Sequence, residues 1–76
     1  MIQELDLVIL TCDLPKNGLT RGDVGTVVLS HPGGGYEVEF MALDGETLAV
    51  VSLSPNQVRP IGHREIAHAR PIGLAS

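Results

Sequence analysis

Turn-forming residues recur so often along this chain that no long helix fits between them. The 76 residues include nine glycines and five prolines. They gather at residues 15–22, in the Pro32–Gly35 turn, at Asp44-Gly45 and around Pro55 and Pro60. Such clusters punctuate a chain into turns, and the segments between them have the length of β-strands. The sequence therefore predicts an all-β protein.

The clearest strand lies directly after the glycine-rich turn. Tyr36, Val38 and Phe40 alternate with Glu37 and Glu39. A period of two puts the apolar side chains on one face of a strand and the acidic ones on the other. We expect this strand to be half buried and half exposed to solvent.

Similar patterns predict five strands and one helical turn. The expected strands cover residues 4–11, 23–31, 35–42, 46–53 and 58–61. A helical turn is expected at Pro55–Gln57, where Ser54 precedes the proline as a capping residue. Gly25, inside the second strand, predicts a bulge or a close backbone approach.

Five short strands, a long first loop, two hairpins and a helical turn before the last strand describe a small five-stranded SH3-like β-barrel. We assign residues 1–61 to this barrel and residues 62–76 to a C-terminal tail that is flexible or ordered by a partner. The aromatic residues number only two, so the core must be largely aliphatic. The predicted core residues are Leu7, Ile9, Val24, Val27, Val38, Phe40, Val50 and Val58.

A tetrapeptide repeats in the tail. Arg59-Pro60-Ile61-Gly62 recurs as Arg70-Pro71-Ile72-Gly73. One interpretation is chance, or a small duplication left in a disordered tail. The other is that the second copy, with Ile72 and Leu74 alternating, mimics the last strand at a sheet edge that Pro60 leaves open. The tail would then support a homo-oligomer or dock on a partner.

The charge distribution disfavours a polyanion as ligand. The net charge is −4, and residues 1–60 hold eight acidic against three basic residues. Affinity for nucleic acid comes from Lys and Arg that neutralise phosphates. The first ten residues lack a basic region, and no apolar run approaches a membrane span, so we expect neither a signal peptide nor a membrane anchor. The single Cys12 fits a reducing cytoplasm.

Several segments, in order, resemble one known family. "ELDLVILTCDLPKNGLTRGDVGTVV", "YEVEF", "DGETLAVVSL" and "QVRPI" are similar to a family of small bacterial proteins catalogued as a domain of unknown function, over residues 2–61. The resemblance implies an SH3-like barrel in a prokaryotic cytoplasm and carries no catalytic residues. A partner encoded by a neighbouring gene, such as a toxin, is typical of such short genes.

No catalytic, cofactor or metal site is predicted, and we expect no enzymatic activity. Cys12 ends an apolar strand, where a free cysteine acts as a small hydrophobe. His63 and His68 are five residues apart, which separates them on a helix and does not match zinc spacing. The glycines after Pro32 lead into a strand, whereas a phosphate-binding loop leads into a helix.

Two binding functions remain. "RGDVGTVV" is distantly similar to KOW-type barrels, which makes a nucleic-acid, ribosome- or transcription-associated domain the alternative. We favour a non-enzymatic protein-binding module, an acidic antitoxin or accessory partner of a neighbouring gene product, since acidic surfaces steer basic partners. The candidate binding residues are Asp13, Lys16, Arg21, Glu37, Glu39, Glu46, Arg70 and Ile72.

Overall fold

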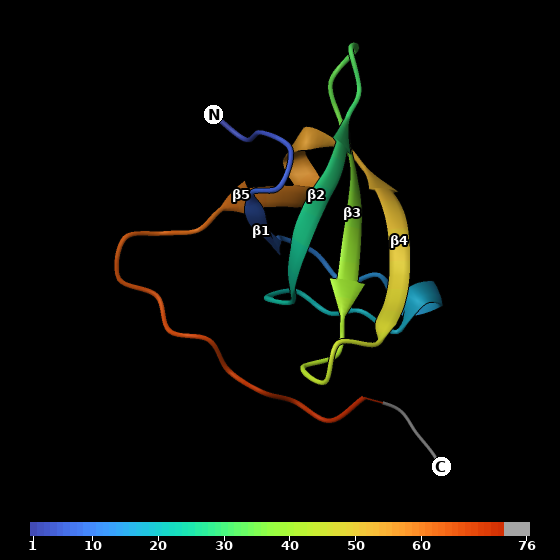
Figure 1. Cartoon of the computed structure of the whole chain (residues 1–76), viewed down its shortest axis with the longest axis vertical. Helices are drawn as coiled ribbons and strands as arrows, with labels where there is room; N and C mark the ends of the chain where they lie inside the picture. Colours follow the sequence, from blue (N-terminus) through green and yellow to red (C-terminus); the bar gives the residue numbers. More distant parts are fainter. Residues whose placement is uncertain (73–76) are drawn as a thin grey trace.

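The computed structural model describes residues 1–72 and forms one antiparallel sheet. Its strands are β1 (Leu7–Leu10), β2 (Val24–Ser30), β3 (Tyr36–Met41), β4 (Thr47–Leu53) and β5 (Val58–Pro60). Their order across the sheet is β4-β3-β2-β1-β5. The sheet curls so that β1 and β5 run across the direction of β2, β3 and β4 (Figure 1). The all-β, five-stranded prediction is confirmed; the finer likeness to SH3 barrels stays a prediction.

Two short 3-10 helices complete the fold. The predicted turn is confirmed as η2 (Pro55–Gln57), where the Ser54 N–H donates to Gln57 Oε1 at 2.9 Å. The other, η1 (Pro15–Asn17), lies in the β1–β2 loop and was not predicted. Proline fixes the backbone of its first residue, and Gly18 ends it in the left-handed region with φ of 69°.

Strand boundaries agree with the predictions to within one residue except at the start of β1. Leu5 has φ of 73°, a left-handed conformation that a regular strand cannot contain. The Leu5 N–H still donates to the Val27 carbonyl at 2.7 Å, and the Val27 N–H donates to the Asp6 carbonyl at 2.9 Å. The residues before β1 therefore lie beside β2 and bond to it, but they do not form part of the strand.

The core confirms five of the eight predicted core residues. The buried apolar residues are Val8, Ile9, Leu10, Leu19, Val27, Val38, Phe40, Leu53 and Val58. The prediction was wrong for Leu7, Val24 and Val50, which are 52%, 42% and 56% exposed.

The sheet register explains these three errors. Val8 lies opposite Gly25, and Leu7 opposite Thr26, so the inward positions of β1 begin at Val8. Side chains alternate along a strand, and Val24 therefore faces the side opposite to Gly25. Where two apolar residues adjoin, as in each of these strands, alternation alone does not show which one points inward.

Gly25 provides a close backbone approach, one of its two predicted roles. A Cβ atom at residue 25 would lie 2.5 Å from Cγ1 of Val38 and 2.8 Å from Cε1 of Phe40. The bulge in β2 lies further along, where the register with β3 shifts between Val27 and Leu29. Two core side chains of β3 therefore occupy the space above the glycine.

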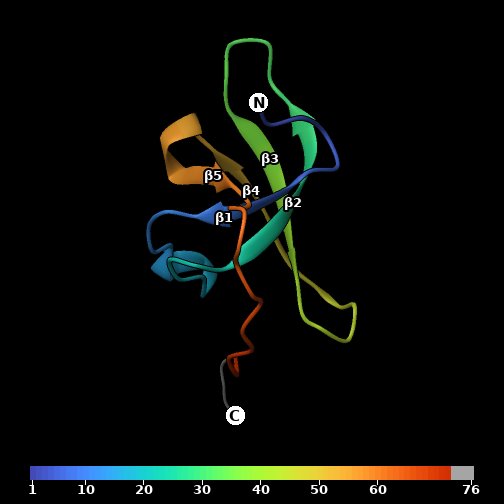
Figure 2. The same ribbon diagram turned by 90° about the vertical axis from the view of Figure 1, so that its left-hand side faces the viewer.

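The chain after β5 continues without helix or strand as far as residue 72. It leaves the sheet beside β5 and runs down past the lower ends of the strands (Figures 1 and 2). Residues 70–72 lie against the β1–β2 loop of their own chain, and the alternative that the second tetrapeptide mimics β5 at the edge of a neighbouring sheet stays a prediction. Gly73 and Leu74 lie outside the described residues. Within residues 1–72, no helix is long and apolar enough to cross a membrane.

We expect Gly25→Ala to destabilise the protein by about 1–3 kcal/mol, because the new methyl group overlaps Val38 and Phe40. Urea unfolding of the two proteins measures the difference. Gly33→Ala is the matched control, since a Cβ there meets nothing within 4 Å. Equal unfolding midpoints for the two variants would contradict the close packing.

Candidate functional site

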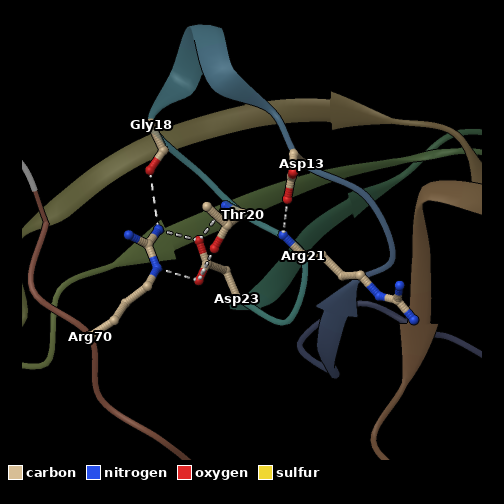
Figure 3. Close-up of polar contacts among 6 residues, drawn as sticks. All are labelled: Asp13, Gly18, Thr20, Arg21, Asp23 and Arg70. Carbon is tan, nitrogen blue, oxygen red and sulfur yellow. Dashed lines mark hydrogen bonds and ion pairs between the residues drawn. The ribbon is translucent and has the colours of Figure 1, made fainter.

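The β1–β2 loop is held in shape by its own hydrogen bonds. Asp13 Oδ1 accepts a hydrogen bond from the Arg21 N–H at 2.8 Å (Figure 3). Leu14 and Leu19 exchange backbone hydrogen bonds of 2.9 and 3.1 Å. Leu19 is buried in the core and anchors the loop to the sheet. The loop is therefore a defined surface feature with η1 at its tip.

Asp23 joins this loop to the tail. Its carboxylate accepts a hydrogen bond from the Thr20 N–H at 2.9 Å. Arg70 donates to both carboxylate oxygens, through Nε at 2.9 Å and Nη2 at 2.5 Å. The same Nη2 donates to the Gly18 carbonyl at 3.1 Å. Figure 3 shows Arg70 reaching up from the tail, whereas the Arg21 guanidinium points away from Asp23.

The ion pair determines how Asp23 titrates. Burial raises the pKa of this carboxyl group, but hydrogen bonds from Arg70 and the Thr20 N–H, with the charge of Arg70, lower it below its usual value. The carboxylate therefore stays ionised and paired across the neutral range.

A second arginine holds the first part of the tail. Arg59 donates to both carboxylate oxygens of Glu65, through Nη1 at 3.0 Å and Nη2 at 2.6 Å. The Gly62 N–H donates to the same carboxylate. Together the arginine and this N–H lower the pKa of Glu65 to about 2. The arginine of each tetrapeptide copy thus forms a bidentate ion pair, with a different partner in each case.

Acidic side chains of β3 face away from the core. Glu39 Oε2 accepts a hydrogen bond from Thr47 Oγ1 at 2.6 Å. Glu37 Oε2 accepts one from Ser52 Oγ and contacts His31 Nε2 at 2.7 Å. The hydrogen bonds from Ser52 and His31 lower the pKa of Glu37. Both carboxylates are therefore oriented by hydroxyl groups of β4.

Apolar side chains flank these carboxylates. The register aligns Leu7, Thr26, Glu39 and Val50 in one row across four strands. The two ends of this row are about half exposed. We call Glu37, Glu39, Leu7 and Val50 the acidic outer face. It presents charge between two apolar side chains, a mixture that suits an amphipathic partner surface.

Ser52, Glu37 and His31 contain the residue types of a hydrolase triad but not its geometry. In a triad the histidine contacts the serine hydroxyl and the acid orients the histidine. Here the serine hydroxyl and the histidine both contact Glu37, which lies between them. The histidine does not contact the Ser52 hydroxyl, so these three residues do not form such a triad.

The predicted binding residues fall into separate groups. Asp13 and Lys16 line a shallow hollow of about 370 Å³ beside η1. Ile72 lines another, of about 290 Å³, with Leu48 and Leu19. Glu46 lies in the β3–β4 turn, where its N–H donates to Asp44 Oδ1 at 3.0 Å. Among residues 1–72, no hydrogen bond or ion pair links the loop residues to the acidic outer face.

Sequence reasoning missed the partners of these residues. Asp23 is not among the predicted binding residues, and its pairing with Arg70 joins positions 47 residues apart. The hydroxyls of Thr47 and Ser52 follow from the β3–β4 register, which a tight Asp44-Gly45 turn suggests but does not fix. In the described part of the chain, no group of three or more His, Cys, Asp or Glu side chains could hold a metal ion.

Comparison with known proteins places the chain in a family. A family model described as a domain of unknown function (DUF4926) matches residues 4–60, and the chain belongs to this family. The matched range contains all five strands and stops before the tail. Neither the curated proteins nor the solved structures contain a significant match to the chain.

We expect Arg70→Ala to release the end of the tail, because it removes both bonds to Asp23. The folded-state pKa of Asp23 lies below its ordinary value of 3.8. The pairing is therefore fully present above that value and is lost as the pH falls through the folded-state pKa. Backbone ¹⁵N relaxation of residues 66–72, measured from neutral to acidic pH, should show rigid amides that become mobile in acid.

Arg64→Ala is the control, because Arg64 makes no ion pair with any residue from 1 to 72. It should keep the response to pH, whereas Arg70→Ala should show mobile amides throughout. Identical relaxation in the two variants would show that Arg70 does not hold the tail.

Proposed function

We propose that this protein is a non-enzymatic, cytoplasmic binding module whose acidic outer face takes a basic protein surface, the product of a neighbouring gene. An acidic antitoxin that covers a basic toxin is the form of this function that the proposal favours. The observation that carries it is the placement of Glu37 and Glu39 on one face of β3, between the half-exposed side chains of Leu7 and Val50.

Pre-oriented carboxylates suit arginine and lysine side chains. Ser52 and Thr47 hold the two glutamates in place, which reduces the entropy lost when a partner binds. Each carboxylate can accept about four hydrogen bonds, so acceptor positions remain for a guanidinium group. The lowered pKa of Glu37 keeps it charged in the neutral range.

The same surface argues against two other ligands. Grooves that bind proline-rich peptides need several exposed aromatic side chains. The only aromatic residues are Tyr36 and Phe40, and both pack in or against the core. A nucleic acid would meet the two carboxylates of β3 with its phosphates, which is repulsive.

We expect the double variant Glu37→Gln/Glu39→Gln to weaken binding of the basic partner by at least about tenfold, because it removes two charge-assisted contacts. The partner should first be captured by the wild-type protein from its native host and matched to the adjacent genes. Calorimetry at several salt concentrations then measures the affinity. The wild-type affinity should fall as salt increases.

Asp44→Asn/Glu46→Gln is the charge-matched control, since it removes two carboxylates from the β3–β4 turn outside the acidic outer face. This control should stay within about twofold of wild type at moderate salt, where the Debye length is about 8–10 Å. Equal loss in both double variants would show that net charge alone drives binding and would refute the proposed site.

We also expect no RNA or DNA binding beyond weak, non-specific association at physiological salt. Fluorescence anisotropy with labelled single- and double-stranded oligonucleotides measures this directly. A micromolar affinity that decreases with salt would support the KOW-like alternative and contradict the protein-binding proposal.

A further inference from the structure

The two edges of the sheet differ in how they are protected. β5, the edge next to β1, has three residues and ends at Pro60, and the tail continues directly from it. Short strands and proline are common protections for sheet edges. β4, at the opposite edge, has seven residues and, within residues 1–72, pairs only with β3. The edge at β5 is therefore short and ends in a proline, whereas the edge at β4 offers a strand of seven residues.

β4 lacks charge and proline, two of the usual protections, and its one irregularity is a bulge at Leu48, where the register with β3 shifts between Phe40 and Met41. Its sequence, Thr-Leu-Ala-Val-Val-Ser-Leu, contains no charged residue and no proline. Every second residue of an edge strand points its backbone N–H and C=O away from the sheet. Within residues 1–72, apart from the pairing with β3, no backbone group of β4 takes part in a hydrogen bond. These groups form a template for one more strand.

From the sequence of this edge we infer that its occupant is β4 of a second copy, paired antiparallel about a two-fold axis at Val50. In this register Val50 lies opposite itself and Ala49 opposite Val51, which places the axis in the regular part of β4, after the bulge at Leu48. Because β4 has no charge, no like charges meet at the junction, although each chain carries a net charge of −4. A two-fold pair needs such a self-complementary strand.

Exposure along β4 fits this pairing. Val50 and Leu48, 56% and 38% exposed, are large apolar residues on a strand with high β-propensity. Val50 would contact its own copy across the axis, as cross-strand neighbours do in any antiparallel pair. The acidic carboxylates stay one strand away, on β3. The junction joins one seven-residue strand to its copy, so we expect a weak, concentration-dependent dimer.

The inference is independent of the partner proposed above, but it extends that surface. Strands paired about a two-fold axis form one continuous sheet, and the same face of each copy lies on the same side. Glu39 and Val50 of one chain would then continue into Val50 and Glu39 of the other. The dimer would present two acidic outer faces side by side.

Sedimentation equilibrium over a wide concentration range tests the dimer. The wild-type mass should rise from the 8.0 kDa of one chain toward twice that value at the sub-millimolar concentrations used for NMR. Amide hydrogen exchange should show increasing protection of β4 over the same range. A mass of one chain at every concentration, with unchanged exchange in β4, would overturn the inference and leave this edge for a strand of another protein.

Val50→Lys places two like charges opposite each other at the axis and should raise the dimer dissociation constant at least about tenfold. Leu7→Lys is the matched control. It adds the same charge to a side chain of similar exposure, 52%, on the interior strand β1. It should keep the wild-type dissociation constant, while circular dichroism checks that both variants are folded.

Equal weakening in the two variants would mean that association does not depend on β4 and would overturn the inference. Because sedimentation measures the dimer in the protein alone, without a basic partner, the dimer and the binding of a basic partner can fail separately.

Discussion

The packing of β3 over Gly25 fixes the rest of the structure. Phe40 is the largest fully buried side chain, and with Val38 it fills the space that a side chain at residue 25 would need. A chain with no tryptophan and one phenylalanine has few ways to fill a core. Here the ring of Phe40 packs directly against the backbone of Gly25, which has no side chain. Once Gly25 faces inward, alternation sets the direction of the side chains of β2 as far as Val27 and, through the register, of the residues opposite them on β1 and β3.

The acidic outer face follows from this alternation of inward and outward side chains. Because Gly25 and Val38 point inward, Thr26 and Glu39 must point outward, and they lie opposite each other in the β2–β3 pair. Leu7 pairs with Thr26 and therefore also points outward. Charge and apolar surface are therefore brought together by a packing constraint on the other side of the sheet. A slip of one residue would bury the glutamates and expose the core.

Much of this fold is readable from sequence because its turns and its clearest strand carry local signals. Strand number, the two hairpins and η2 all follow from glycine, proline and alternation. The inward face of Tyr36–Phe40 was predicted correctly because its neighbours are glutamates. Adjacent apolar pairs such as Leu7 with Val8, and Val50 with Val51, carry no such signal, so their orientation depends on the register with a neighbouring strand. The late start of β1 is also non-local in origin, since Leu5 turns to bond with Val27.

The repeated tetrapeptide shows the limit of sequence similarity within a chain. Its first copy ends a strand, because β1 offers a pairing edge to residues 58–60. Residues 70–72 of the second copy pair with no strand of the described chain, and Arg70 is instead held by Asp23. The partner of each arginine is set by what the fold brings near: Glu65 in the adjoining tail for Arg59, and a loop 47 residues away in sequence for Arg70. Arg59 thus lies in the last strand of the sheet, whereas Arg70 tethers the tail to the β1–β2 loop, because the surrounding contacts differ at the two positions.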